Sequence, residues 1–95
     1  MFAVFVTFEI SPEHRDAFIP RMLQQAEDSL DNEPNCGIFE VWLDGKNPER
    51  VQLYEVYTDA AAFDYHLQSA HFKDFAQTVA PMIVSRTIST FDRKL

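Results

Sequence analysis

The stretch FAVFVTFEI, residues Phe2–Ile10, decides how the rest of the chain must fold. Apolar side chains occupy every second position of this stretch, at Val4, Val6, Phe8 and Ile10. This spacing of β-branched and aromatic residues predicts a strand. Because Ala3 and Phe5 lie on the alternate face, we expect the strand to be buried on both of its faces.

A helix is predicted to follow this strand directly. Ser11 is a good N-cap residue, and Pro12 fits the first helical position, where its missing N–H costs nothing. Apolar residues three and four positions apart continue the pattern to Leu30. Pro20 disturbs the pattern, because a proline inside a helix removes one hydrogen bond and costs about 3 kcal/mol. We therefore expect either a kink at Pro20 or a late start of the helix.

The remaining segments predict a hairpin, a second helix and a last strand. Residues 38–43 and 50–57 have strand composition and flank a loop of turn-forming and charged residues. Asp59 can cap a helix, Ser69 can cap its continuation, and residues 82–91 alternate as a strand does. The order βαββαβ with an antiparallel sheet is typical of an α+β, ferredoxin-like fold.

Composition limits the chain to one domain, residues 1–95, and indicates a partner. The chain has 46% hydrophobic residues and nine Phe, which suffice for one core but not two. The first strand is apolar on both sides, and Phe39, Trp42, Tyr54 and Phe91 cannot all face the helices. We expect the exposed sheet face to pack against a second copy, forming a homodimer with two-fold symmetry.

Charge and cysteine content exclude several classes of function. The formal charge is −7, from 15 acidic and 8 basic residues, which disfavours nucleic-acid binding. Cys36 is the single cysteine, so we expect no disulfide and treat it as a small buried residue. The apolar start is too short for a membrane span and has no basic leader, so we expect a soluble, cytoplasmic protein with no membrane partner.

The candidate catalytic residues are ionisable groups inside apolar segments. His66 borders the apolar stripe of the second helix, and Glu55 and Tyr57 share one face of the third strand. If that face meets the helices, His66 can approach Glu55, and an imidazole held by a carboxylate can act as a general base. The alternative is a satisfied core pair without catalytic function. Thr7 and Glu9, on one face of the first strand, are weaker candidates for polar groups of a pocket.

A metal site is not expected from the histidine spacing. His71 follows His66 by five residues, which in an unbroken helix turns the two side chains about 140° apart. They could form a metal-binding pair only if the helix breaks at Ser69.

Four segments of the chain resemble the antibiotic biosynthesis monooxygenase (ABM) domain family, and most closely its quinol monooxygenase branch. They are residues 33–36, 53–59, 62–63 and 66–72. The resemblance implies a dimeric α/β barrel built from two ferredoxin-like halves. It also implies oxidation of a small hydroxylated aromatic substrate by dioxygen, without a cofactor, in a cavity between sheet and helices.

The positions that match the polar pattern of this branch are Glu55, Tyr57, His66 and His71. The resemblance suggests that His66, oriented by Glu55, removes a phenolic proton while Tyr57 or His71 hydrogen-bonds the oxygen that gains charge. Haem-degrading relatives carry an axial histidine where this chain has Ala76, so haem is not expected. Two alternatives stay open: an isomerase of a small phosphorylated diketone, similar to the autoinducer-2 processing enzyme of the branch, and a non-catalytic dimeric ligand-binding or stress-response module.

Overall fold

The computed structural model describes all residues, 1–95, and confirms the predicted order of elements. The chain forms four strands and three α-helices, with a 3₁₀ turn before α1 and another after α3. The elements are β1 (Phe2–Ile10), α1 (Arg15–Asn32), β2 (Cys36–Leu43), β3 (Arg50–Tyr57), α2 (Ala60–Gln68), α3 (Ala70–Val79) and β4 (Ile83–Phe91). None of the helices combines the length and the apolar character that crossing a membrane requires.

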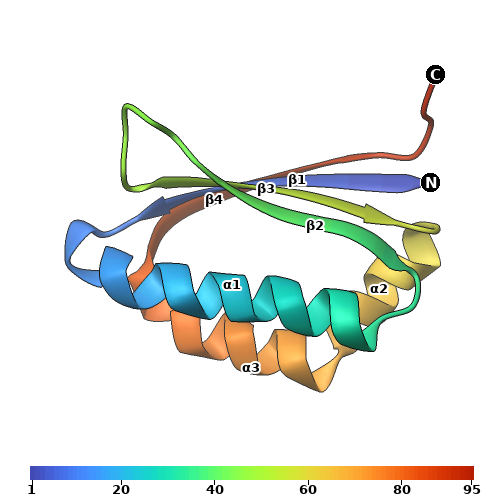
Figure 1. Ribbon diagram of the computed structural model, residues 1–95, viewed down its shortest axis with the longest axis horizontal. Helices are drawn as coiled ribbons and strands as arrows, with labels where there is room; N and C mark the ends of the chain where they lie inside the picture. The colour runs from blue at the N-terminus through green and yellow to red at the C-terminus, as the bar shows by residue number, and fades with distance from the viewer.

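The four strands form one antiparallel sheet in the order β2-β3-β1-β4, and the helices cover one of its faces (Figure 1). This is the predicted α+β, ferredoxin-like fold. The register pairs Val4 of β1 with Glu55 of β3 and Phe39 of β2 with Glu55. Directly paired residues point to the same face of a sheet, so Glu55 lies on the face that the helices cover.

The core lies between the helices and this inner face of the sheet. Val4, Val6, Phe8 and Ile10 are all buried there, as their alternation predicts, and Phe18 of α1 packs edge-on against Phe8. The other face of β1 is open, since the side chain of Phe5 is 37% exposed. The expectation that β1 is buried on both faces is therefore not met within one chain.

Helix α1 starts a few residues after the predicted cap at Ser11, but not late enough to keep Pro20 out of its interior. Residues Pro12–His14 form a 3₁₀ turn, and the α-helix begins only at Arg15. Pro20 then lies inside α1, which continues unbroken through it to Asn32. The hydrogen bond that proline removes is the one to the carbonyl of Asp16, in the first turn, where water can replace it.

The second helical segment breaks at Ser69, whose backbone is extended with φ −66° and ψ 148°. The Ser69 side chain accepts a hydrogen bond from the backbone N–H of Phe72 and so caps α3. Asp59 caps α2 in the same way through the N–H of Ala62. In a continuous helix each residue is rotated by 100° from the one before it. Because the chain is not helical at Ser69, this rule does not fix the relative directions of side chains on α2 and α3.

The core should depend on the aromatic contact beneath α1. Phe18 is fully buried, so we expect Phe18→Ala to lower the free energy of unfolding by about 3–5 kcal/mol through lost burial and a cavity. Leu23→Ala, on the same helix but 52% exposed, should change it by less than about 1 kcal/mol. Urea unfolding followed by circular dichroism measures both values, and equal losses would contradict this description of the core.

Candidate active site

A cavity of about 440 Å³ lies between the inner face of the sheet and the helices. Fourteen of its eighteen lining residues are hydrophobic. The remaining four are Gln25, Glu55, His66 and Arg86. An apolar cavity with a few polar groups is typical of a site for a small organic ligand. Both predicted catalytic residues, His66 and Glu55, therefore line the same cavity.

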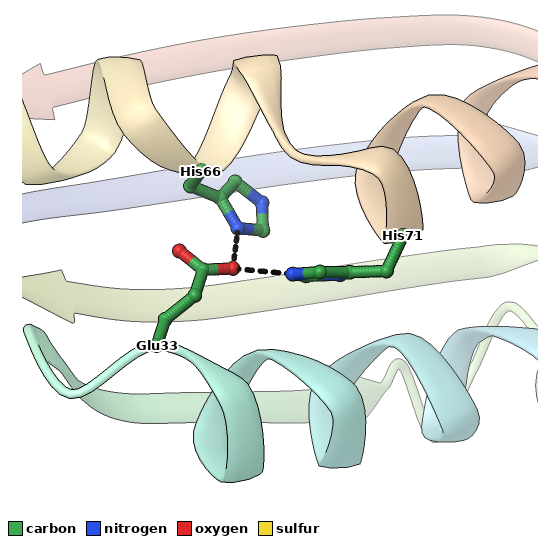
Figure 2. A group of neighbouring side chains, drawn as sticks. All are labelled: Glu33, His66 and His71. Carbon is green, nitrogen blue, oxygen red and sulfur yellow. Dashed lines mark hydrogen bonds and ion pairs between the residues drawn. The ribbon is translucent and has the colours of Figure 1, made fainter.

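The carboxylate that holds His66 belongs to Glu33, not to Glu55. His66 Nδ1 lies 2.8 Å from Glu33 Oε2, and the two side chains are only 2% and 4% exposed (Figure 2). The prediction that Glu55 is the partner of His66 is wrong. Glu33 ends α1, and the packing of α1 beside the segment α2–α3 brings it to His66, whereas Glu55 is hydrogen-bonded within β3.

The hydrogen bond to Glu33 fixes the tautomer of the His66 ring. Burial among the rings of Phe63 and Phe72 lowers the pKa of His66 in spite of the nearby Glu33, so the imidazole is neutral at neutral pH. An ionised carboxylate only accepts hydrogen bonds, so Nδ1 carries the proton. Nε2 then holds the lone pair, and it makes no hydrogen bond to another residue of the protein.

His71 reaches the same carboxylate from α3. Its Nε2 lies 2.7 Å from Glu33 Oε2 (Figure 2). Its Nδ1 lies 3.1 Å from the side-chain amide nitrogen of Gln25. The break at Ser69 is the condition under which the two histidines could converge, and that condition is met. One ligand atom each from Glu33, His66 and His71 lies within 4.8 Å of the others, so these are the side chains that could hold a metal ion.

Tyr57 supports Glu55 in the wall of the cavity. Its hydroxyl donates a hydrogen bond of 2.6 Å to Glu55 Oε1, which confirms that the two side chains point together. Burial raises the pKa of Glu55 to about 7; the negative charge of Glu33 adds to the rise and the Tyr57 hydrogen bond opposes it. Burial also raises the pKa of Tyr57, which stays protonated and a donor.

Three predicted substrate-binding residues do not line the cavity. Tyr57 stands behind Glu55, and His71 stands behind His66 and Glu33. Thr7 points to the other face of the sheet, where its hydroxyl donates to the Gln52 side chain. The prediction of Thr7 as a pocket residue is wrong for a simple reason: its neighbours Val6 and Phe8 face the cavity, and adjacent strand residues alternate.

Sequence reasoning missed Glu33, Gln25 and Arg86. Of these, only Glu33 could have been noticed in the sequence. An acidic side chain at the C-terminal end of a helix interacts unfavourably with the helix dipole, so its presence there suggests a role other than stabilising the helix. Arg86 is the one cationic side chain in the cavity wall, and it extends from β4. Cys36 is buried, as predicted, and burial raises the pKa of its thiol to about 11, so it is unreactive.

The sequence profile of the family described as "Antibiotic biosynthesis monooxygenase" matches residues 1–78. The chain belongs to the antibiotic biosynthesis monooxygenase family. The matched region of this family member includes Glu33, Glu55, His66 and His71, whereas Arg86 lies beyond it in β4. A search of curated proteins finds no match.

Solved structures share the fold of this antibiotic biosynthesis monooxygenase family member over its whole length. A crystal structure described as an antibiotic biosynthesis monooxygenase is 25% identical, with all of both chains covered and a TM-score of 0.91. A protein of Nitrosomonas europaea named as a candidate for the same activity is 23% identical, with all of both chains covered and a TM-score of 0.93. A conserved protein of Methanosarcina mazei Go1 is 23% identical, covering 98% of this chain and 92% of that chain, with a TM-score of 0.90.

The raised pKa of Glu55 predicts a pH-dependent stability. The folded protein holds this proton up to about pH 7, whereas the unfolded chain loses it near the ordinary value of 4.5. The protonated Glu55 therefore contributes to the free energy of unfolding. This contribution is fully present below about pH 4.5 and is lost as the pH rises through about 7. We expect Glu55→Gln, which can still accept from Tyr57, to lack this dependence.

Urea unfolding of both proteins between pH 5 and pH 8 measures the effect. The free energy of unfolding of the wild type, relative to Glu55→Gln, should fall with rising pH by no more than about 3 kcal/mol. If the difference in free energy of unfolding between the two proteins stayed constant across this pH range, Glu55 would not hold a proton in the folded protein near pH 7.

Proposed function

We propose that this protein is a monooxygenase that oxidises a quinol or a similar hydroxylated aromatic with dioxygen, without a cofactor. The observation that carries the proposal is His66, a neutral imidazole held by the buried Glu33 carboxylate in the wall of an apolar cavity. Membership of the antibiotic biosynthesis monooxygenase family supports an oxidoreductase activity.

In this proposal His66 is the general base. A phenolic hydroxyl of the substrate gives its proton to Nε2, while Nδ1 keeps its hydrogen bond to Glu33. Glu33 orients the ring and stabilises the imidazolium that forms, which is the function the sequence had assigned to Glu55. Glu55 lines the same cavity with its carboxyl partly protonated near pH 7, so it can donate a hydrogen bond to a substrate oxygen that gains charge.

The oxidation itself uses the electrons of the substrate. A deprotonated quinol is a much better electron donor to dioxygen than the neutral form. One oxygen atom enters a ring C–H position, the other leaves as water, and the product is a hydroxylated quinone. The aromatic and aliphatic walls keep bulk water away from the reacting groups.

The base assignment predicts a large loss of activity on substitution of His66. Metal-free protein is incubated with a menadiol-type quinol, with and without dioxygen, and oxygen uptake and labelled oxygen in the product are measured. We expect His66→Ala to lose about 100-fold or more in turnover rate, the usual contribution of a general base. His14→Ala, a histidine outside the cavity, should retain the wild-type rate.

Equal turnover by wild type and His66→Ala would overturn the assignment. Conversion of a phosphorylated diketone without oxygen uptake would favour the isomerase instead. Ligand-dependent thermal stabilisation without turnover of either substrate would favour a binding module.

We also propose that two copies pack through the open face of the sheet. Phe5, Tyr54 and Phe91 form an aromatic cluster there, with ring centroids 5.1 and 5.9 Å from Phe5. Trp42 and Phe91 are 60% and 59% exposed in the single chain. Such a cluster on a small domain favours a partner, and a second identical face closed by two-fold symmetry supplies one.

A charge on this face should separate the copies. We expect Trp42→Glu to shift the mass in solution from twice the chain mass of 11.0 kDa to a single copy, because an unpaired carboxylate would be buried at the interface. Leu23→Glu, exposed on α1, should leave the mass unchanged. Analytical ultracentrifugation at micromolar concentration measures both, and a wild type that sediments as a single copy would contradict the dimer.

A further inference from the structure

Unsatisfied polar atoms gather around Glu33. Four buried side-chain nitrogen or oxygen atoms of the protein lack a hydrogen-bond partner, and three of them are Gln25 Oε1, Glu33 Oε1 and His71 Nε2. His71 Nε2 is 2.7 Å from Glu33 Oε2, yet it has no partner with hydrogen-bond geometry. Buried polar groups normally have a hydrogen-bond partner. Three unpaired polar atoms in one cluster therefore indicate a binding site for an ion or molecule.

The chemistry of the cluster favours a cation. The only basic groups that pair with Glu33 are the two imidazoles, and no Lys or Arg lies within ion-pair distance of its carboxylate. The Glu33 carboxylate is therefore a buried acidic group with no Lys or Arg to pair with it. A buried charge is stable when it is paired or coordinates a metal.

We infer that Glu33, His66 and His71 form a binding site for a divalent transition-metal ion of the Zn²⁺ type. His66 Nδ1, His71 Nε2 and a Glu33 carboxylate oxygen are the ligand atoms, and they already lie within 4.8 Å of one another. Two imidazoles and one carboxylate are a common three-ligand set for zinc, which leaves a fourth position for water.

The ligand atoms lie close together, but they must move before they can surround an ion. Zinc–ligand distances of about 2.0–2.2 Å place neighbouring ligand atoms of a tetrahedral site roughly 3.3 Å apart. The contacts of 2.7 and 2.8 Å at Glu33 Oε2 must therefore open by about half an ångström. Oε1 of Glu33 has no hydrogen-bond partner, so the carboxylate is free to rotate as these contacts open.

Gln25 can supply the outer support that a metal-binding histidine requires. Its amide nitrogen faces His71 Nδ1 at 3.1 Å, while its Oε1 is unpaired. Oxygen and nitrogen of an amide exchange places on a half-turn, after which Oε1 accepts from Nδ1–H. The proton then sits on Nδ1, and Nε2 presents its lone pair to the metal, which is the usual arrangement for a ligating imidazole.

Metal binding would change the state of His66, and this step rests on the proposed function. A neutral ring that gives its Nδ1 lone pair to a metal carries its proton on Nε2, the nitrogen proposed to act as the base. The loaded protein would then lack His66 as the base. Zn²⁺ is therefore expected to inhibit quinol oxidation, and a chelator to restore it.

The site is tested by binding alone, without any substrate. Metal-free protein is titrated with Zn²⁺ by calorimetry and in competition with a chromophoric chelator, with Mg²⁺ as the comparison ion. We expect one Zn²⁺ per chain, no detectable Mg²⁺ binding, and at least tenfold weaker Zn²⁺ binding in His71→Gln and Glu33→Gln. The control His14→Gln should bind as the wild type does.

Co²⁺ provides a second readout, because its visible spectrum reports the ligand geometry in the folded wild type and needs no variant. A strong absorption band typical of a four-coordinate site is expected, and His71→Gln should lose it while keeping its circular dichroism. No Zn²⁺ binding, or equal affinity in His71→Gln and His14→Gln, would overturn the metal site and leave ordered water in the cluster. Either result is independent of quinol turnover, so failure of the metal site and failure of the proposed function can be told apart.

Discussion

One carboxylate oxygen, Glu33 Oε2, joins the three helices beneath the sheet. It lies at the end of α1 and meets an imidazole from α2 and another from α3. A carboxylate this deeply buried is costly unless such partners surround it, so the helices must pack as they do around Glu33. The orientation of His66 follows from this contact, and so does the presence of its unpaired nitrogen at the cavity. The fold and the candidate chemistry thus depend on the same atom.

Most of the fold could be predicted from the sequence because its signals are local. Alternation in Phe2–Ile10, the caps at Asp59 and Ser69 and the order of elements all describe neighbouring residues. The partner of His66 could not be predicted, because Glu33 is separated from it by two strands and most of α2. The two-residue period of a strand correctly placed the side chains of Glu55 and Tyr57 on the same face. A single strand does not reveal which of its faces meets the helices, and for that reason the prediction placed Thr7 on the wrong face.

The aromatic residues of the sheet lie on both of its faces: one set lines the cavity and the other set is exposed on the open face. Phe8 and Phe39 face inward and line the cavity, while Phe5, Trp42 and Tyr54 face outward. The cavity takes up space that a domain of 95 residues would otherwise fill with packed side chains. The proposed packing of a second sheet on the outer aromatic residues would offset that loss.

The extended residue at Ser69 also constrains how the sequence can change. Four residues separate His66 from His71, and the single non-helical position among them sets where the second ring points. Adding or removing one residue here would rotate α3 relative to α2 by about 100° and carry His71 away from Glu33. Surface loops tolerate changes of length, but this junction should not. Among related proteins, the spacing between the two histidines, together with a capping side chain between them, would therefore identify chains that can build the same cluster.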